Sequence, residues 1–100
     1  MVSSRGRRTA RHVLQLPLMP QPWRWAVFEK IVPPNCRRYY KIEIVPATEG
    51  WFVVTYHGRI GKSLKRMIEL ARSIDEAEMI AWKRARDRFL HEYTLKEAGR

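Results

Sequence analysis

Residues 55–61, with the sequence TYHGRIG, are those best suited to binding chemistry in this 100-residue chain. Gly58 and Gly61 flank Arg59, and glycine permits positive φ angles and close approach of a neighbouring segment. The Arg59 guanidinium offers five N–H donors in a planar fork that fits a carboxylate or a phosphate. His57 can stack on a ring or donate a hydrogen bond. The pattern predicts a turn between two strands that presents one arginine to an anionic group.

Catalytic sites are not indicated by the same residues. The Gly-Lys-Ser triplet at 61–63 resembles the end of a nucleotide-binding P-loop, but that loop requires glycine at position 56, which is tyrosine here. His12, His57 and His91 are scattered, and Cys36 has no neighbour at metal-ligand spacing. A nucleophilic pair of Cys36 with His57 or His91 is compatible with the sequence, although no spacing singles it out. We predict no catalytic residue, metal site or cofactor, and therefore a protein that is not an enzyme.

The charge of the chain favours an anionic partner. Twenty Lys and Arg residues against ten Asp and Glu residues give a formal charge of +10. Such an excess attracts polyanions such as DNA or RNA, although it also serves plain solubility. A hydrophobic content of 45% with 11% aromatic residues suffices for one small core, so we expect a single folded domain.

Composition also limits the cellular compartments in which the protein is expected. Cys36 is the only cysteine, which excludes a disulfide within the chain and fits a reducing compartment. Apolar runs are far shorter than the roughly 20 residues that span a bilayer, so no membrane partner is expected. These observations favour a cytoplasmic protein, with association with the nucleoid as a further option.

Residues 1–22 are predicted to form a flexible tail. This segment contains three prolines and no acidic residue. It can serve as a simple leader, as a basic arm that lies along phosphates, or as a cleaved organelle-targeting peptide. Its candidate phosphate-binding residues are Arg5, Arg7, Arg8 and Arg11.

Between the tail and an expected helix, the sequence shows the patterns of three strands. Residues 23–32 are rich in aromatic and branched side chains and stop at Pro33 and Pro34. Residues 37–45 alternate polar and apolar side chains, and residues 51–57 are apolar on both faces, as in an interior strand. Short connections between the three strands favour an antiparallel meander. Residues 64–72 fit a helix or a strand, and propensity favours the helix.

Ser73 and Glu76 form a capping box at the start of a helix expected over residues 74–91. A set of apolar side chains at helical spacing can form its buried stripe: Ala77, Ala81, Trp82, Ala85, Phe89 and Tyr93. Basic side chains occupy the rest of the helix, and their simplest interpretation is a solvated surface: Lys83, Arg84, Arg86, Arg88 and His91.

In order along the chain, several of these features resemble the WGR domain, a family named for a Trp-Gly-Arg triplet. The matching residues cover about residues 25–94 and are Asn35, Tyr39, Tyr40, Trp51, Gly58, Arg59, Ile60, Gly61 and the segment 73–77. The resemblance implies an α+β fold, in which a twisted antiparallel sheet of about four strands carries one long C-terminal helix on a face. It also implies that residues 64–72 are an edge strand. The domain would then comprise residues 23–94, and residues 95–100 would form a C-terminal tail.

WGR domains occur in DNA-damage-responsive poly(ADP-ribose) polymerases, where they hold DNA breaks, and in stand-alone bacterial proteins. In the polymerases the triplet tryptophan packs on a nucleotide sugar, whereas this chain has the smaller His57 at that position. The resemblance implies a noncatalytic module that binds duplex DNA or DNA ends through backbone phosphates. The candidate contacts are His57, Arg59, Lys62, Asn35, Arg37 and Arg38. Alternatives are an adaptor that docks an acidic protein on the Arg59 turn, or an RNA-binding accessory protein; a small-molecule substrate is not expected.

Overall fold

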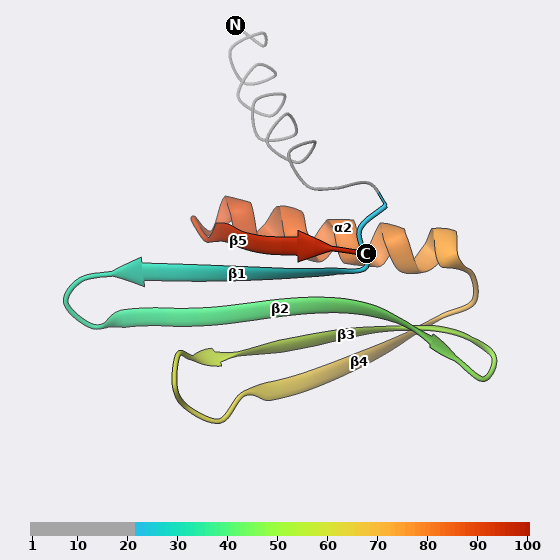
Figure 1. The fold of residues 1–100 in the computed structure, drawn as a ribbon, viewed down its shortest axis with the longest axis horizontal. Coiled ribbons are helices and arrows are strands. Elements are labelled where there is room, and N and C mark those ends of the chain that lie inside the picture. Colours follow the sequence, from blue (N-terminus) through green and yellow to red (C-terminus); the bar gives the residue numbers. More distant parts are fainter. Residues whose placement is uncertain (1–21) are drawn as a thin grey trace, which may run out of the picture.

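The structure, a computed structural model, describes residues 22–100 and contains one sheet and one helix in this part of the chain. The elements in order are β1 (Trp25–Val32), β2 (Cys36–Ala47), β3 (Gly50–Arg59), β4 (Lys65–Ala71), α2 (Ile74–Leu90) and β5 (Thr94–Gly99). The strands lie in the order β4-β3-β2-β1-β5, and all neighbours are antiparallel (Figure 1). The predicted α+β class is confirmed.

Segment 64–72, which fitted either a helix or a strand, contains strand β4. Residues Lys65–Ala71 pair with β3 along the edge of the sheet, as the family resemblance implied and helix propensity did not. Tertiary pairing therefore outweighs local propensity at this segment.

The sheet has five strands rather than about four, because the predicted C-terminal tail forms strand β5 against β1. Gly99 lies opposite Trp25, and a Cβ added to Gly99 would lie 2.7 Å from the Cζ2 atom of that indole. The missing side chain lets the Trp25 ring lie over the last strand. The helix is accordingly not the last element, and with 17 residues it is of moderate length.

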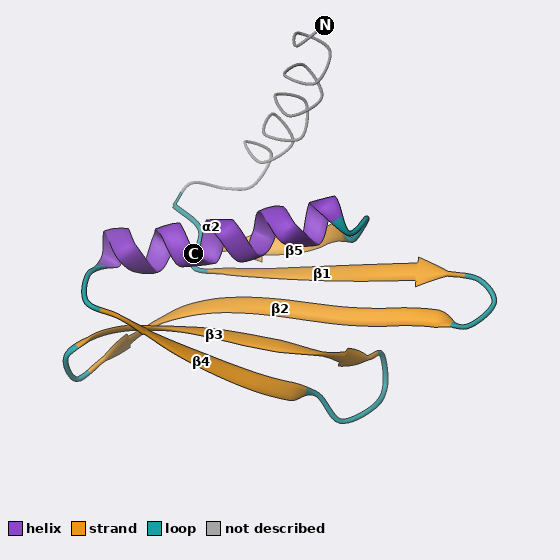
Figure 2. Cartoon of the chain, turned by 180° about the vertical axis from the view of Figure 1, so that it is seen from behind, coloured by secondary structure: helices purple, strands orange, loops and turns teal. Residues whose placement is uncertain are grey.

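Helix α2 covers one face of the sheet, and the core lies between the two layers (Figure 2). Its buried residues are the three alanines of the predicted stripe, Ala77, Ala81 and Ala85. Small side chains allow the helix backbone to approach Phe28, Ile42 and Val53 on the sheet, all of which are fully buried. The larger stripe residues flank this contact, with Trp82 against Trp23 and Phe89 against Phe28 in edge-to-face pairs.

The predicted capping box forms at the start of α2. The Glu76 backbone N–H donates to Ser73 Oγ at 3.1 Å. In return, Glu76 Oε1 accepts from the Arg72 backbone N–H at 2.6 Å, one residue before the cap. Two backbone donors are thereby satisfied, which defines where the helix begins.

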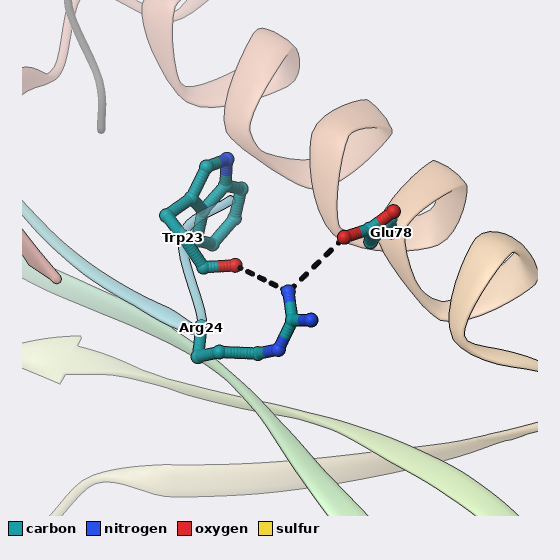
Figure 3. Close-up of polar contacts among 3 residues, drawn as sticks. All are labelled: Trp23, Arg24 and Glu78. Carbon is teal, nitrogen blue, oxygen red and sulfur yellow. Dashed lines mark hydrogen bonds and ion pairs between the residues drawn. The ribbon is translucent and has the colours of Figure 1, made fainter. Parts of the chain in front are cut away.

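Arg24 joins the segment before β1 to the second turn of helix α2. Its guanidinium Nη1 donates to Glu78 Oε2 at 3.0 Å and to the Trp23 carbonyl oxygen at 3.2 Å (Figure 3). Trp23 is 2% exposed, so the folded body already includes this residue before β1.

Candidate nucleic-acid interface

Three connections meet at one end of the sheet, which we call the turn end. They are the 33–35 turn between β1 and β2, the 60–64 loop between β3 and β4, and the connection from α2 to β5 (Figure 1). Strands β1 and β3 and helix α2 run toward this end, and β2, β4 and β5 run away from it, so the three connections lie at the same end. Asn35 and Lys62 lie in the turn and the loop, and both are exposed.

Alternation along β2 separates the two predicted arginines. Arg38 lies on the face covered by the helix, with Tyr40 and Ile42, whereas Arg37 lies on the open face. Arg59 stands directly opposite Arg38 in the β2–β3 register, so both guanidinium groups belong to the covered face. The sequence predicted both Arg37 and Arg38 as phosphate contacts. In the sheet, their side chains lie on opposite faces.

His57 lies one register position deeper in the same face. It is half-buried, faces Tyr40 across the strands, and stacks on that ring at a centroid distance of 6.4 Å and an angle of 28°. Lys65 on β4 lies opposite His57 on its other side. The histidine is therefore held on an aromatic surface with cationic side chains beside it.

The two glycines act in different ways. Gly61 has a φ of +85° and turns the chain out of β3, as the sequence predicted. Gly58 has no positive φ and lies within the strand. A Cβ there would lie 3.1 Å from Leu64 Cδ2 and 3.2 Å from the Ser63 carbonyl oxygen, so glycine allows the loop to fold back over β3.

The helix contributes two arginines that sequence reasoning had assigned to a solvated surface. The Arg88 guanidinium carbon lies 4.3 Å from the Tyr40 ring centroid and 5.0 Å from that of Tyr93. Arg84, one turn earlier, donates from Nη2 and Nε to Glu69 Oε1 at 2.8 and 3.1 Å. Their i,i+4 spacing beside the buried Ala81 and Ala85 is the signal that could have placed both against the sheet.

Several of these residues line a cavity of about 240 Å³ between the sheet and helix α2. Its lining consists of Arg38, Tyr40, His57, Gly58, Met67, Arg84, Arg88 and Tyr93 and includes no carboxylate. We call Arg38, His57, Arg59, Lys65, Arg84 and Arg88 the basic cluster.

Most of the basic cluster lacks compensating charge. Within residues 22–100, Arg38, Arg59, Lys65 and Arg88 form no ion pair. The hydrogen bond to Glu69 raises the pKa of Arg84, so this side chain stays charged. Burial raises the pKa of Tyr40, and its phenol is neutral at physiological pH. Like charges opposite each other, as at Arg38 and Arg59, cost stability, and such local conflicts are typical of binding sites.

Four of the predicted phosphate contacts cannot be placed in the structure. Arg5, Arg7, Arg8 and Arg11 fall outside the described residues. From residue 22 onward, no group of three or more His, Cys, Asp or Glu side chains could hold a metal ion. In the same segment, no helix has the length and apolar character of a membrane span.

The comparison with protein families gives one result. The WGR domain model matches residues 26–100, about three quarters of the chain, and includes the helix and all five strands except the first residue of β1. No curated protein and no solved structure matches the chain significantly.

Proposed function

We propose, because this chain belongs to the WGR domain family, that it is a noncatalytic module that binds duplex DNA or DNA ends through backbone phosphates. WGR domains are a noncatalytic family known as nucleic-acid-binding domains of poly(ADP-ribose) polymerase-like proteins. The match extends through β5, so the whole folded body corresponds to this one module.

The basic cluster is the observation that carries the proposal. Cations from β2, β3, β4 and α2 converge at the turn end, where no described carboxylate faces Arg38, Arg59 or Lys65 in an ion pair. Phosphates of a nucleic acid would supply the missing negative charge and release counterions on binding. Three further residues lie beside the cluster and can contact more phosphates of the nucleic acid: Asn35 in the turn, Lys62 in the loop and Arg37 on the open face.

Salt dependence tests the electrostatic part. A protein that contacts 6–10 phosphates loses about 10³–10⁵-fold in affinity between 50 and 200 mM salt. We expect a fall of this order for a fluorescently labelled blunt duplex, measured by anisotropy with the full chain. Equal affinity across that range would refute binding through phosphates.

A pair of matched substitutions tests the location. Arg59 and Arg72 are both exposed arginines, but Arg59 lies at the turn end and Arg72 follows β4 at the opposite end. Arg59→Gln should weaken duplex binding and reduce the slope of log affinity against log salt by about 1, since one phosphate contact is lost. Arg72→Gln should change neither quantity. Equal effects would mean that net charge, and not the turn end, governs binding.

The same surface can accept an acidic protein or single-stranded RNA, and a competition experiment separates these partners. Unlabelled blunt duplex, nicked duplex and single-stranded RNA compete against the labelled duplex at one salt concentration. The proposal predicts that duplex DNA competes best. Superior competition by RNA would favour an RNA-binding accessory protein instead, whose bases would stack on exposed aromatic residues.

A further inference from the structure

We infer that the outer edge of strand β4 is a self-association surface, on which a second copy of this chain adds its own β4 as the next antiparallel strand. β4 is the last strand of the sheet on the side away from β5 (Figure 1). It pairs with β3 on one side, and within residues 22–100 no strand pairs with its other side. Such an edge presents unpaired backbone N–H and C=O groups to which another strand can bind. The inference goes beyond the proposed function, because the partner is a protein held through backbone and apolar groups.

The two edges of the sheet differ in how far they are protected against such pairing. Strand β5 has six residues, carries Lys96 and Glu97 in its middle, and shifts its register with β1, as at a β-bulge. Short length, charge and irregular register are the features by which proteins protect an edge. Strand β4 keeps a continuous register with β3, has no proline, and carries Lys65 and Arg66 only at its start. Pairing of β4 with β4 therefore gives a closed symmetric dimer, because the protected β5 edges do not extend it.

The β4 edge also carries exposed apolar side chains. Half of the large hydrophobic residues exposed in the described part of the chain lie in this short segment: Leu64, Met67, Ile68 and Leu70. Ile68 and Leu70 are 50% and 62% exposed and lie on the open face, opposite Val54 and Phe52 of β3. Apolar side chains that gather in one place on a surface are typical of protein interaction sites. A second β4 would cover this part of the edge.

The sequence of β4 is complementary to itself in the antiparallel direction. A symmetric pair centred on Ile68 aligns the whole strand, and no like charges oppose each other. The opposing residues of the two copies are Ile68 with Ile68, Met67 with Glu69, Arg66 with Leu70 and Lys65 with Ala71. Lys65 also lies diagonally across from Glu69 of the second copy, within reach of its long side chain. Opposing residues point to the same face, so the exposed Ile68 side chains of the two copies meet on a continuous open face.

The size and charge of the chain set the strength of this association. One strand pair is a small interface, and interfaces below about 1,200 Å² are typical of weak or transient association. Each copy has a formal charge of +10, so two copies repel each other, and salt screens this repulsion. The dimer is therefore expected to be weak and to strengthen as salt is raised. Binding to phosphates has the opposite dependence on salt.

Sedimentation velocity with the full chain tests the association. Protein concentrations from about 1 μM to about 1 mM cover dissociation constants in the same range. We expect a monomer–dimer equilibrium whose dissociation constant is severalfold lower at high salt than at low salt. Ile68→Lys places two ammonium groups opposite each other and removes apolar contact, so it should raise this constant about tenfold or more. Met79→Lys, which adds the same charge at an exposed apolar residue of α2, is the control and should leave the constant unchanged.

A chain that stays monomeric at every concentration and salt, or equal effects of the two substitutions, would overturn the inference. If the monomeric chain still bound duplex DNA, the proposed function would stand without the dimer. Circular dichroism spectra of both variants check that they fold.

Oxidative cross-linking tests the geometry of the pair, in a Cys36→Ser background that removes the free thiol. Ile68→Cys places two thiols opposite each other, where opposing Cα atoms lie about 4.5–5.5 Å apart and a disulfide can form. Ile31→Cys, at an exposed residue of the open face on β1, is the control. We expect a disulfide-linked dimer on non-reducing gels for Ile68→Cys and little for Ile31→Cys. Equal cross-linking of both would indicate contact between open faces and overturn pairing at the edge.

Discussion

The two faces of the sheet differ in how their charged residues are paired. On the open face, Lys41 Nζ lies 3.3 Å from Glu43 Oε2, and Lys96 Nζ lies 4.0 Å from Glu29 Oε1. At the turn end of the covered face, Arg38 and Arg59 oppose each other with no carboxylate between them. These two lysines on the open face are neutralised locally, as Arg84 is by Glu69 on the covered face, whereas Arg38 and Arg59 leave uncompensated positive charge beside the cavity. This difference is the reason why we propose that an anionic ligand binds at the covered face, which also contains the core.

The largest expected effect is on the free energy of unfolding, and it distinguishes a core residue from a residue on the open face. Phe28 lies under the helix and is fully buried, whereas Ile31, on the same strand, points to the open face and is 56% exposed. Phe28→Ala should lower the free energy of unfolding by about 3–5 kcal/mol, because it removes buried surface and leaves a cavity. Ile31→Ala should change it by no more than about 0.5 kcal/mol. Urea denaturation measures both, and similar losses would contradict the assignment of the faces.

The next largest loss of stability is expected at the N-terminal cap of helix α2, the helix that covers one face of the sheet. Ser73→Ala removes the acceptor of the Glu76 backbone N–H and should cost about 1 kcal/mol of unfolding free energy. Ser63→Ala, in the exposed 60–64 loop, is the control and should be nearly neutral. A loss at Ser63 as large as that at Ser73 would mean that the cap does not stabilise α2.

A smaller effect is expected at alkaline pH. Burial on the covered face raises the pKa of Tyr40, so folding favours its neutral form. Its contribution to stability is fully present below the unfolded pKa of about 10 and is lost as the pH rises through the higher folded value. The slope from this one proton is at most about 1.4 kcal/mol per pH unit. Urea titrations between pH 8 and 11 should show a shallower alkaline decline for Tyr40→Phe than for the wild type; an unchanged decline would argue against the burial effect.

The smallest effect is expected on the open face. Lys41→Gln removes a solvent-screened ion pair with Glu43 and should cost between 0 and about 1 kcal/mol. The loss should shrink further in 0.5 M NaCl, where screening acts within a few ångströms. A larger or salt-independent loss would mean that the open face is less solvated than its exposure indicates.

The strands that alternate were predictable, and β5 was not. Tyr40, Ile42 and Ile44 lie on the covered face, as their spacing of two predicted. Residues 94–99 have no such pattern, with Leu95 and Ala98 as their partly buried apolar residues. Pairing with β1 stabilises this strand, and a partner distant in sequence leaves no trace in a local pattern.

The turn of the candidate site could be predicted from the sequence, whereas the arginines of helix α2 that line the cavity could not. His57, Arg59 and the positive φ of Gly61 follow from seven consecutive residues. Arg84 and Arg88 are about 25 to 30 residues further along and carry the same charge as their solvated neighbours. What assigns them to the cavity is the helix crossing, which brings Arg88 over Tyr40.

The amino-acid sequence by itself determined the positive charge, the start of the helix at Ser73 and the turn at Gly61, since each depends on composition or on adjacent residues. Only the tertiary structure decided which cations share a surface. Strand pleating directs neighbours such as Arg37 and Arg38 to opposite faces, and antiparallel registry then sets Arg38 beside Arg59. A binding surface depends on distances across the sheet, and these arise only when the strands and the helix have packed.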